Sequence, residues 1–329
     1  MTLPLLTVSL SASPGTIGEA PTTPSITSTA ASAILRTASI QQTGAVVKVR
    51  GTDARGEVYG TGFAVDPSGT ICTVTDLVRG SDIIVIVKDG KEYPCDIVAL
   101  DEGSGAAFLK VTGEMRRSGE QFLPPRATTA PSPFTPVLAI GYSREEKPAA
   151  SLGMITGTQS HEGESYFRVP LNLAKIPIAE GEAGSPVLDL DGHLIGMVLS
   201  CIPQNGDCRI LPVGAIEKLH TDLLRFGQLN PGWVGAVVEE VAVPEGNSST
   251  RIAQVEPGSP AEIAGLRAGD MILTLGNRRI TQPDKLLEAS FYLTAGENVL
   301  MSIWRGGEIR RVQIHCINPP DTKYQPATP

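Results

Sequence analysis

The sequence has no cluster of lysine and arginine residues. Its 27 basic and 35 acidic residues give a formal net charge of −8 at pH 7, and no run of basic residues occurs anywhere. Proteins that bind nucleic acid or anionic membranes need local positive charge. No stretch approaches the roughly 18 apolar residues of a membrane-spanning helix. We therefore expect neither nucleic acid nor an anionic membrane as a partner, and no membrane span.

Cysteine is scarce and lacks the CxxC spacing of a zinc site, so we expect no metal and no cofactor. The five cysteines are Cys72, Cys95, Cys201, Cys208 and Cys316. Their odd number leaves at least one unpaired, and buried thiols are the simplest interpretation. Cys201 and Cys208 flank a polar turn between two strand-like runs, so a disulfide between them in an oxidising compartment is the alternative. The sequence leaves both open.

Short β-branched runs broken by 35 glycines and 26 prolines indicate a mainly β protein with little helix. Six such runs with tight turns between Ala45 and Val111 predict a small antiparallel barrel. A second set between Val137 and Val213 predicts another barrel, which an amphipathic helix over 215–226 completes.

The two ends of the chain differ from the rest in composition. Residues 1–40 are rich in Ser, Thr, Ala and Pro and predict a leader, either a signal peptide or a disordered segment, with a short helical pattern over 31–42. The polar segment 226–231 is typical of a domain linker, and the polar composition of 317–329 predicts a disordered tail.

One glycine-rich turn organises the middle of the chain. It reads Gly-Glu-Ala-Gly-Ser-Pro-Val-Leu over 181–188, and an Asp-Gly turn and a Leu-Ile-Gly strand follow it. This stretch resembles the nucleophile loop of HtrA/Deg-type, trypsin-like serine proteases, in which Gly-Asn-Ser-Gly-Gly-Pro-Leu precedes an Ile-Gly strand. The resemblance extends over 41–227 and implies a trypsin-like double six-stranded β-barrel.

Matching the family's motifs to this chain shows that each catalytic position is substituted. Asp76 stands in Thr-Val-Thr-Asp-Leu-Val where the family has its histidine, and Gly105 stands where the family has its aspartate. Ala183 replaces the nucleophilic serine. Without hydroxyl, imidazole and carboxylate, the reaction has no nucleophile and no base. The resemblance further implies a vestigial oxyanion loop made of Gly181, Glu182, Ala183 and Gly184.

Substitutes for the lost groups are hard to find. None of the four histidines, His161, His193, His220 and His315, lies in the first barrel, and we expect all of them on the solvated surface. Ser185 most simply replaces a glycine of the motif, and its hydroxyl has no base to activate it.

The C-terminal part, 228–316, resembles the PDZ domain that HtrA proteases carry. Its Pro-Gly-Ser-Pro-Ala-Glu stretch can begin a helix with Ser259 as N-cap and Glu262 in a capping box. The resemblance implies that peptides or protein C-termini bind here by strand addition, with their carboxylate held by backbone N–H groups. The residues implied are Trp233, Val234, Gly235, Ala236, Leu286, Leu287 and Ser290. For Leu286 and Leu287, a role in the domain core is the alternative.

The sequence thus predicts a mainly β, catalytically inactive HtrA-like protein that acts as a peptide-binding, scaffolding or regulatory subunit. The resemblance implies an extracytoplasmic location and an active HtrA-type protease as a partner, and it leaves open whether the chain forms a homotrimer. Two alternatives remain: an active endopeptidase that uses unrecognised residues, and a chaperone-like holdase.

Overall fold

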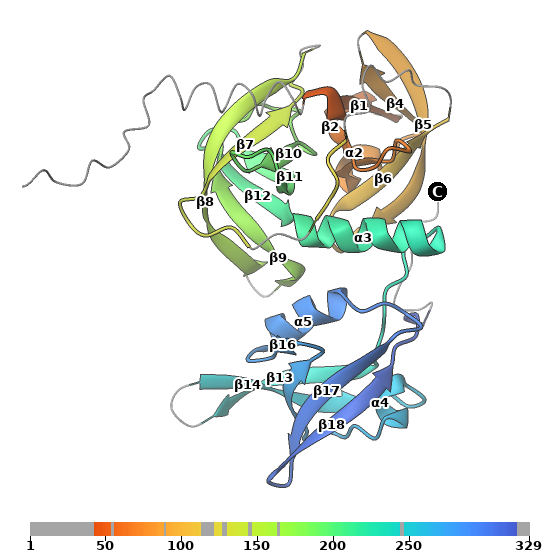
Figure 1. The fold of residues 1–329 in the computed structure, drawn as a ribbon, viewed down its shortest axis with the longest axis vertical. Helices are drawn as coiled ribbons and strands as arrows, with labels where there is room; N and C mark the ends of the chain where they lie inside the picture. Colours follow the sequence, from red (N-terminus) through yellow and green to blue (C-terminus); the bar gives the residue numbers. More distant parts are fainter. Residues whose placement is uncertain are drawn as a thin grey trace, which may run out of the picture.

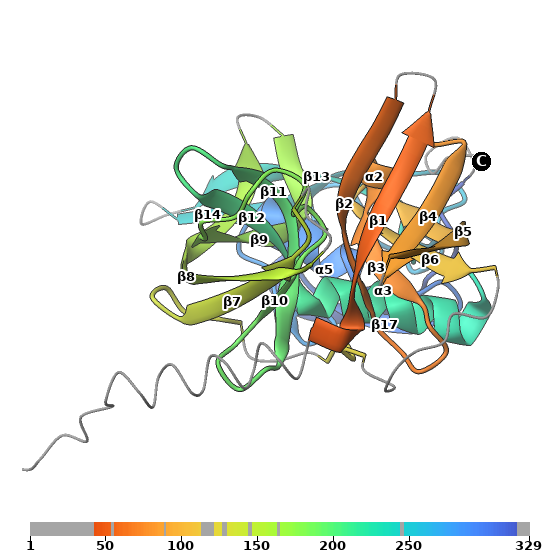
Figure 2. The same ribbon diagram turned by 90° about the horizontal axis from the view of Figure 1, so that it is seen from above.

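The computed structural model describes residues 43–53, 56–88, 90–112, 122–126, 130–143, 147–162, 165–243 and 247–320. Two closed barrels lie side by side, and a C-terminal sheet domain packs below them (Figures 1 and 2). The mainly β architecture expected from the sequence is confirmed. The expected leader over 1–40 and the helical pattern over 31–42 lie outside the described residues.

The first barrel is an antiparallel six-stranded barrel in the order β1-β2-β3-β6-β5-β4. Its strands are β1 (Val46–Asp53), β2 (Gly56–Ala64), β3 (Ile71–Val74), β4 (Ile83–Lys88), β5 (Lys91–Asp101) and β6 (Ala106–Val111). A short 3-10 turn, η1 (Thr43–Ala45), precedes it, and the one-turn helix α2 (Thr75–Val78) follows β3. The second half of β2 is buried throughout, because it lies against the second barrel as well as the barrel core.

The second barrel repeats this plan in the order β10-β11-β12-β9-β8-β7. Its strands are β7 (Pro136–Gly141), β8 (Ala149–Glu162), β9 (Ser165–Lys175), β10 (Pro186–Leu188), β11 (Leu194–Ile202) and β12 (Asp207–Pro212). The amphipathic helix α3 (Val213–Phe226) leaves this barrel and packs along the first one. It ends where Gly227 adopts a left-handed conformation and donates its N–H to the Leu223 carbonyl.

The C-terminal domain is a twisted antiparallel sheet with two short helices. Its elements are β13 (Ala236–Val243), β14 (Asn247–Val255), α4 (Pro260–Ile263), β15 (Met271–Leu275), β16 (Arg278–Arg279), α5 (Pro283–Phe291), β17 (Asn298–Arg305) and β18 (Glu308–His315). The Ser259 hydroxyl accepts the Glu262 N–H, so Ser259 caps α4 as the sequence predicts. Ile317 pairs with Trp233, so the first residues of the segment predicted as a tail lie against this domain.

Apolar side chains form one continuous core across the barrel interface. Buried residues of the first barrel, of α3 and of one face of the second barrel belong to a single cluster, while the interior of the second barrel and the C-terminal domain each form their own. The two barrels are therefore held together by shared apolar packing, and their interface is tight except where polar residues line it.

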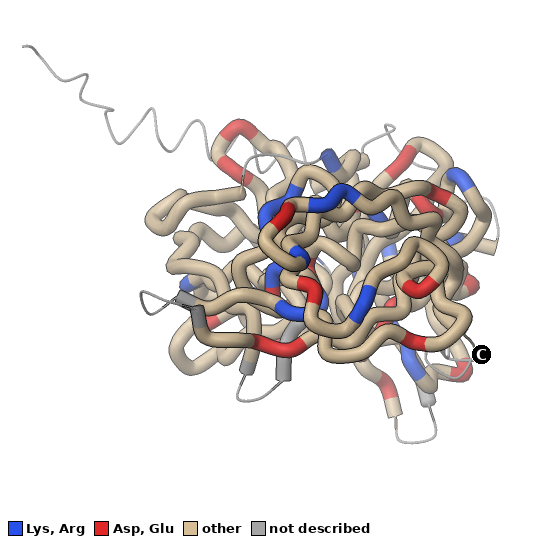
Figure 3. The backbone as a smooth tube through the Cα atoms, turned by 90° about the horizontal axis from the view of Figure 1, so that it is seen from below, with Lys and Arg blue, Asp and Glu red and all other residues tan. Residues whose placement is uncertain are grey.

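Charged residues of both signs alternate over the face of the C-terminal domain (Figure 3). Among the described residues, no helix is both long enough and apolar enough to cross a bilayer.

Candidate functional site

All seven residues predicted to bind peptide line one cavity in the C-terminal domain. This cavity, the C-terminal groove, has a volume of about 290 Å³. It runs between β13 and α5, and β13 is an edge strand of the sheet. Trp233, Val234, Gly235 and Ala236 line one side, and Leu286, Leu287 and Ser290 line the other.

The loop before β13 presents free backbone donors to this groove. Its carbonyl groups are occupied: Val234 O accepts from Ala261 N and Gly235 O accepts from Glu256 N, each at 2.9 Å. Among the described residues, the N–H groups of Val234 and Gly235 donate to no backbone carbonyl. Two adjacent N–H groups of this kind can hold a carboxylate.

The structure distinguishes the two leucines on α5. Leu286 packs against the buried cluster of the C-terminal domain, whereas Leu287 is not part of that cluster, although both line the groove. The apolar floor of the groove comes from Val238, Ile272 and Met301, which the sequence analysis did not single out.

A second wall of the C-terminal groove comes from the barrels, which the sequence did not predict. Arg168 on β9 and Lys218 on α3 line the groove together with their acidic partners. Arg168 Nη1 lies 3.6 Å from Asp101 Oδ1, and Lys218 Nζ lies 2.5 Å from Asp222 Oδ2. Both charges of each pair lie on the same wall, so the wall is polar but has little net charge.

Asp76 and Gly105 lie next to each other in a second cavity, here called the interbarrel cleft. The Thr75 N–H at the start of α2 donates to the Gly105 carbonyl at 2.9 Å, which brings the two positions together. Both residues line the cleft, whose volume is about 270 Å³. The Asp76 side chain is 87% exposed, and its charge faces Arg79 at 3.8 Å.

Leu199 lies against Gly105. Gly105 has φ = +78°, and a Cβ atom there would lie 3.3 Å from Leu199 Cδ2. A carboxylate at position 105 would therefore meet a leucine side chain as well as an unfavourable backbone conformation.

The turn that carries Ala183 is bonded directly to the first barrel. The Thr61 N–H donates to the Ala183 carbonyl at 2.8 Å, and the Gly184 N–H donates to Val198 O at 2.8 Å. A Cβ atom at Gly184, whose φ is +88°, would lie 1.9 Å from Thr61 O, so this close approach requires glycine. Among the described residues, the N–H groups of Gly181 and Ala183 donate to no backbone carbonyl. The backbone of the predicted oxyanion loop thus has two donors available, next to the methyl group of Ala183.

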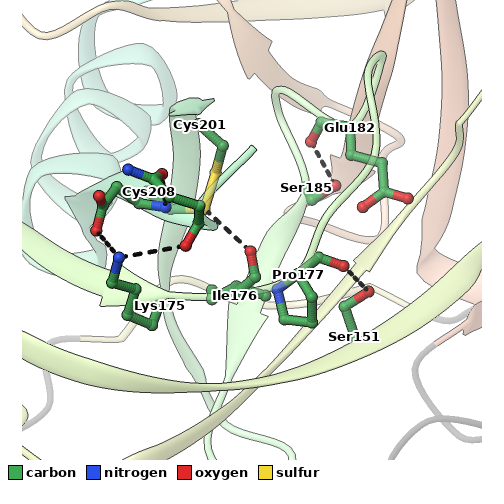
Figure 4. The surroundings of a disulfide bond; sticks show 10 residues. Ser151, Lys175, Ile176, Pro177, Glu182, Ser185, Cys201 and Cys208 are labelled. Carbon is green, nitrogen blue, oxygen red and sulfur yellow. Dashed lines mark hydrogen bonds and ion pairs between the residues drawn. A yellow bond between two sulfur atoms is a disulfide. The ribbon is translucent and has the colours of Figure 1, made fainter. Parts of the chain in front are cut away.

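Glu182 and Ser185 are buried within this turn. The Ser185 hydroxyl donates to the Glu182 carbonyl at 2.6 Å (Figure 4), so it closes the turn and is not poised for attack. The Glu182 side chain is almost fully buried, and this burial raises the pKa of its carboxyl group.

The prediction that all four histidines lie on the solvated surface is wrong for His220. Its side chain is buried against Phe108, and Nε2 lies 2.9 Å from Asp66 Oδ2. Burial alone would raise the pKa of Asp66, but hydrogen bonds from Ser68, His220 and Thr70 outweigh it and hold that pKa well below its usual range. This pair joins α3 to the first barrel behind the cleft. Periodicity along the helix is the signal that could have indicated burial.

The cysteines divide into one pair and three single thiols. Cys201 and Cys208 form a disulfide across the β11–β12 hairpin, while Cys72, Cys95 and Cys316 are buried and free. Burial raises the pKa of the Cys95 thiol to about 12 and also raises the pKa values of Cys72 and Cys316.

The polar turn after β10 brings Asp189, Asp191 and His193 together on the surface. The Asp189 carboxylate already accepts the N–H groups of Asp191 and His193 and contacts the His193 ring at 3.1 Å. These hydrogen bonds stabilise the turn and explain why the three side chains lie close together.

Comparison with known proteins agrees with this geometry. The model of a trypsin-like peptidase domain matches residues 60–197, and that of a PDZ domain matches residues 251–305. A probable periplasmic serine endoprotease, DegP-like, from Halomonas elongata is 25% identical over 280 residues, which cover 80% of this chain and 57% of that protein. A protein of the same description from Hahella chejuensis is 27% identical over 268 residues, which cover 76% and 55%. The chain spans little more than half the length of these relatives.

Solved structures show the same fold. The HtrA-type protease AlgW with a decapeptide superposes with a TM-score of 0.68 at 18% identity and covers 87% of this chain and 99% of its own. The serine endoprotease from Yersinia pestis gives a TM-score of 0.64 at 21% identity, with 87% and 98% covered.

Two closed barrels with a turn of the nucleophile-loop type, followed by a sheet domain with an edge-strand groove, define a trypsin-like double barrel joined to a PDZ domain. The chain belongs to the HtrA-type family, whose members include serine endoproteases.

Proposed function

We propose that this protein is a catalytically inactive member of its family that binds peptides or protein C-termini in the C-terminal groove and acts as a scaffolding or regulatory subunit. We assign residues 41–227 to the double barrel and 228–316 to the PDZ domain. The observation that carries the proposal is the contrast between the two cavities. The groove has available N–H donors and an apolar floor, while the cleft is lined by Asp76 and Gly105, and Ala183 stands in the turn that contacts Thr61.

The chemistry of the interbarrel cleft argues against peptide-bond hydrolysis. Acyl transfer needs a nucleophile, and the methyl group of Ala183 cannot supply one. The Ser185 hydroxyl donates a hydrogen bond to the Glu182 carbonyl, and the buried His220 is hydrogen-bonded to Asp66. Loss of a full triad costs on the order of a millionfold in rate, so any remaining turnover would be negligible.

The C-terminal groove retains what peptide recognition requires. A peptide strand can add to the edge of β13, its carboxylate can accept from Val234 N and Gly235 N, and its terminal side chain can enter the apolar floor. The decapeptide named with AlgW supports this use of a related fold. We expect free C-terminal carboxylates with an apolar last residue to bind best.

Incubation of the purified chain with casein tests the loss of catalysis. We expect no cleavage products by mass spectrometry, and sustained cleavage in a preparation free of other proteases would overturn the proposal. A reconstituted variant, Asp76→His/Gly105→Asp/Ala183→Ser/Leu199→Ala, should show measurable cleavage, because Leu199→Ala gives the new carboxylate room. The matched control keeps Ala183 and carries the other three changes, and it should remain inactive.

Fluorescence anisotropy with peptides tests the groove. A peptide with a free C-terminal carboxylate and an apolar last residue should bind at least about tenfold more tightly than its C-terminal amide, since the amide cannot use the two N–H donors as an anion does. Leu287→Asp should weaken binding by a similar factor through repulsion of the carboxylate. Equal binding of acid and amide would contradict the proposed mode.

The location and partners follow from the relatives. Because the matching proteins are named as periplasmic, we propose an extracytoplasmic location, in which the Cys201–Cys208 disulfide would be stable. An active HtrA-type protease is the partner we would test first by co-purification, and light scattering from the purified chain distinguishes a homotrimer from a monomer.

A further inference from the structure

The β11–β12 hairpin carries the disulfide at its tip. Cys201 faces Cys208 directly in the antiparallel ladder, and residues 202–205 in the turn beyond it are exposed. Cys201 is half-buried and Cys208 is buried, so Cys201 is the more accessible residue of the pair; Figure 4 shows the bond between them.

The same hairpin forms one wall of the interbarrel cleft. Leu199, Ser200, Arg209 and Leu211 all line it. The register of the ladder shifts between Val198 and Ser200, so Leu199 is the extra residue of a bulge and no ladder partner fixes it. Beyond the bulge, only the pairs Ser200 with Arg209 and Ile202 with Asp207 accompany the cysteine pair.

The tip of the hairpin also anchors the segment that leads to Ala183. The Ile176 N–H donates to Gly206 O at 2.9 Å, and Cys208 Sγ lies 3.7 Å from Ile176 O. Lys175 Nζ lies 2.7 Å from Asp207 Oδ1. The chain runs from this anchor into the loop over 176–185, so one short hairpin supports both the cleft wall and the oxyanion loop (Figure 4).

We propose that the Cys201–Cys208 disulfide is a redox latch. It holds Leu199 against Gly105, and it also holds the 176–185 loop in place. A dithiol opens the latch by thiol–disulfide exchange. One thiolate attacks the Cys201 sulfur and releases Cys208, which takes up a proton. The second thiol then attacks its own mixed disulfide and releases Cys201 as a thiol. Two electrons and two protons pass to the cysteines, and the dithiol leaves as a cyclic disulfide.

In the reduced form, the backbone pairs of β11 with β12, the pairing of β12 with β9 and the bonds of the turn still hold the tip, but the covalent link between its two strands is gone. Leu199, already in a bulge, is then able to leave Gly105, and the Gly206–Ile176 anchor loosens with the turn. The free cysteines do not interfere, because Cys72, Cys95 and Cys316 are buried and their raised pKa values keep them as thiols at neutral pH. The latch concerns the mobility of the wall and is independent of whether peptides bind the C-terminal groove.

Hydrogen exchange followed by mass spectrometry on the full chain tests the latch. Oxidised protein, protein reduced with dithiothreitol, and Cys201→Ser/Cys208→Ser are compared, and thiol titration of the unfolded chains counts the free cysteines. We expect amides in 176–185 and 196–211 to exchange on the order of tenfold to a hundredfold faster in the reduced protein, the scale set by releasing a short disulfide loop. The double-serine variant should match it without responding to dithiothreitol, and β17 and β18 should not change.

Other results would overturn the latch. These are equal exchange in both redox states, faster exchange confined to 202–207, a uniform increase over both barrels, or five free thiols before reduction. Cys316→Ser is the matched control, since it removes a cysteine of the other domain and should keep the response of the unmodified chain.

Discussion

The interbarrel cleft and the C-terminal groove are similar in volume, but they differ in what they require from side chains. Catalysis between two such barrels depends on three particular side chains, and in our proposal Asp76, Gly105 and Ala183 stand in their places. Recognition in the groove depends on backbone N–H groups, an edge strand and apolar surface, which many sequences can supply. A few substitutions can therefore abolish turnover while they leave peptide binding intact.

The same contrast holds at the turn around Ala183. The turn around Ala183 keeps its left-handed glycines, its bonds to Thr61 and Val198, and two available N–H donors. This backbone joins the two barrels, so its conformation serves the fold whatever side chain stands at position 183.

The largest effect should come from adding a methyl group to the turn around Ala183. Gly184→Ala places a Cβ at 1.9 Å from Thr61 O in a backbone region unfavourable to alanine, so we expect a loss of about 3 kcal/mol or more in the unfolding free energy of the barrels. Chemical denaturation followed by circular dichroism measures it. Gly235→Ala, whose Cβ would lie 2.3 Å from Ser259 Cβ, is the matched change in the groove and should affect the PDZ domain instead. If each substitution destabilised the barrels and the PDZ domain equally, the two turns would not act on separate domains as we expect.

A smaller effect should appear when one buried carboxylate in each region, Asp66 in the first barrel or Asp270 in the PDZ domain, is replaced by a neutral amide. Hydrogen bonds hold the pKa of Asp66 below its usual value, and Arg305 does the same for Asp270 in the PDZ domain, against the opposing effect of burial in both cases. A lowered folded-state pKa stabilises the protein above the unfolded pKa of about 4 and loses this contribution as pH falls below it. Asp66→Asn should therefore cost about 1–3 kcal/mol at pH 7 and progressively less below pH 4.

Denaturant titrations at pH 7, 4 and 3 measure this convergence. Asp270→Asn should behave in the same way, but in the transition of the PDZ domain, since its carboxylate binds Arg305 at 2.6 Å. A stability difference that stays constant down to pH 3 would contradict the assignment.

The smallest effect should come from the exposed contact between the two regions. Arg225 Nη1 on α3 lies 2.8 Å from Glu297 Oε1 of the PDZ domain, and both side chains are about half exposed. Arg225→Ala should change the unfolding free energy by less than about 1 kcal/mol, because water screens such pairs. Differential scanning calorimetry checks this. Asp222→Asn, at a buried position that binds Lys218 and the Asn230 N–H, is the comparison and should have the larger effect.

Patterns that are local in the sequence predicted most of the fold. Alternating apolar runs and glycine turns gave the strands of both barrels, and the Ser259 cap appears as predicted. The seven groove residues were named from the resemblance to a PDZ domain, and they line one cavity.

Contacts between distant residues could not be predicted. Leu199 meets Gly105 only because the two barrels pack together, and nothing near either residue indicates the other. His220 joins Asp66 across 154 positions. Periodicity along the helix could have indicated that His220 is buried, but nothing near it in the sequence indicated its partner. The barrel wall of the groove was missed for the same reason, since Arg168 and Lys218 lie outside the PDZ sequence.

That shared wall has a practical consequence for ligand discovery. A display screen that uses the excised PDZ domain would offer peptides a trough open on one side, without Arg168, Lys218 and their acidic partners. Such a screen would select peptides without the steric limit and the charged side chains that the barrels provide. The physiological ligand is better sought with the whole chain as bait.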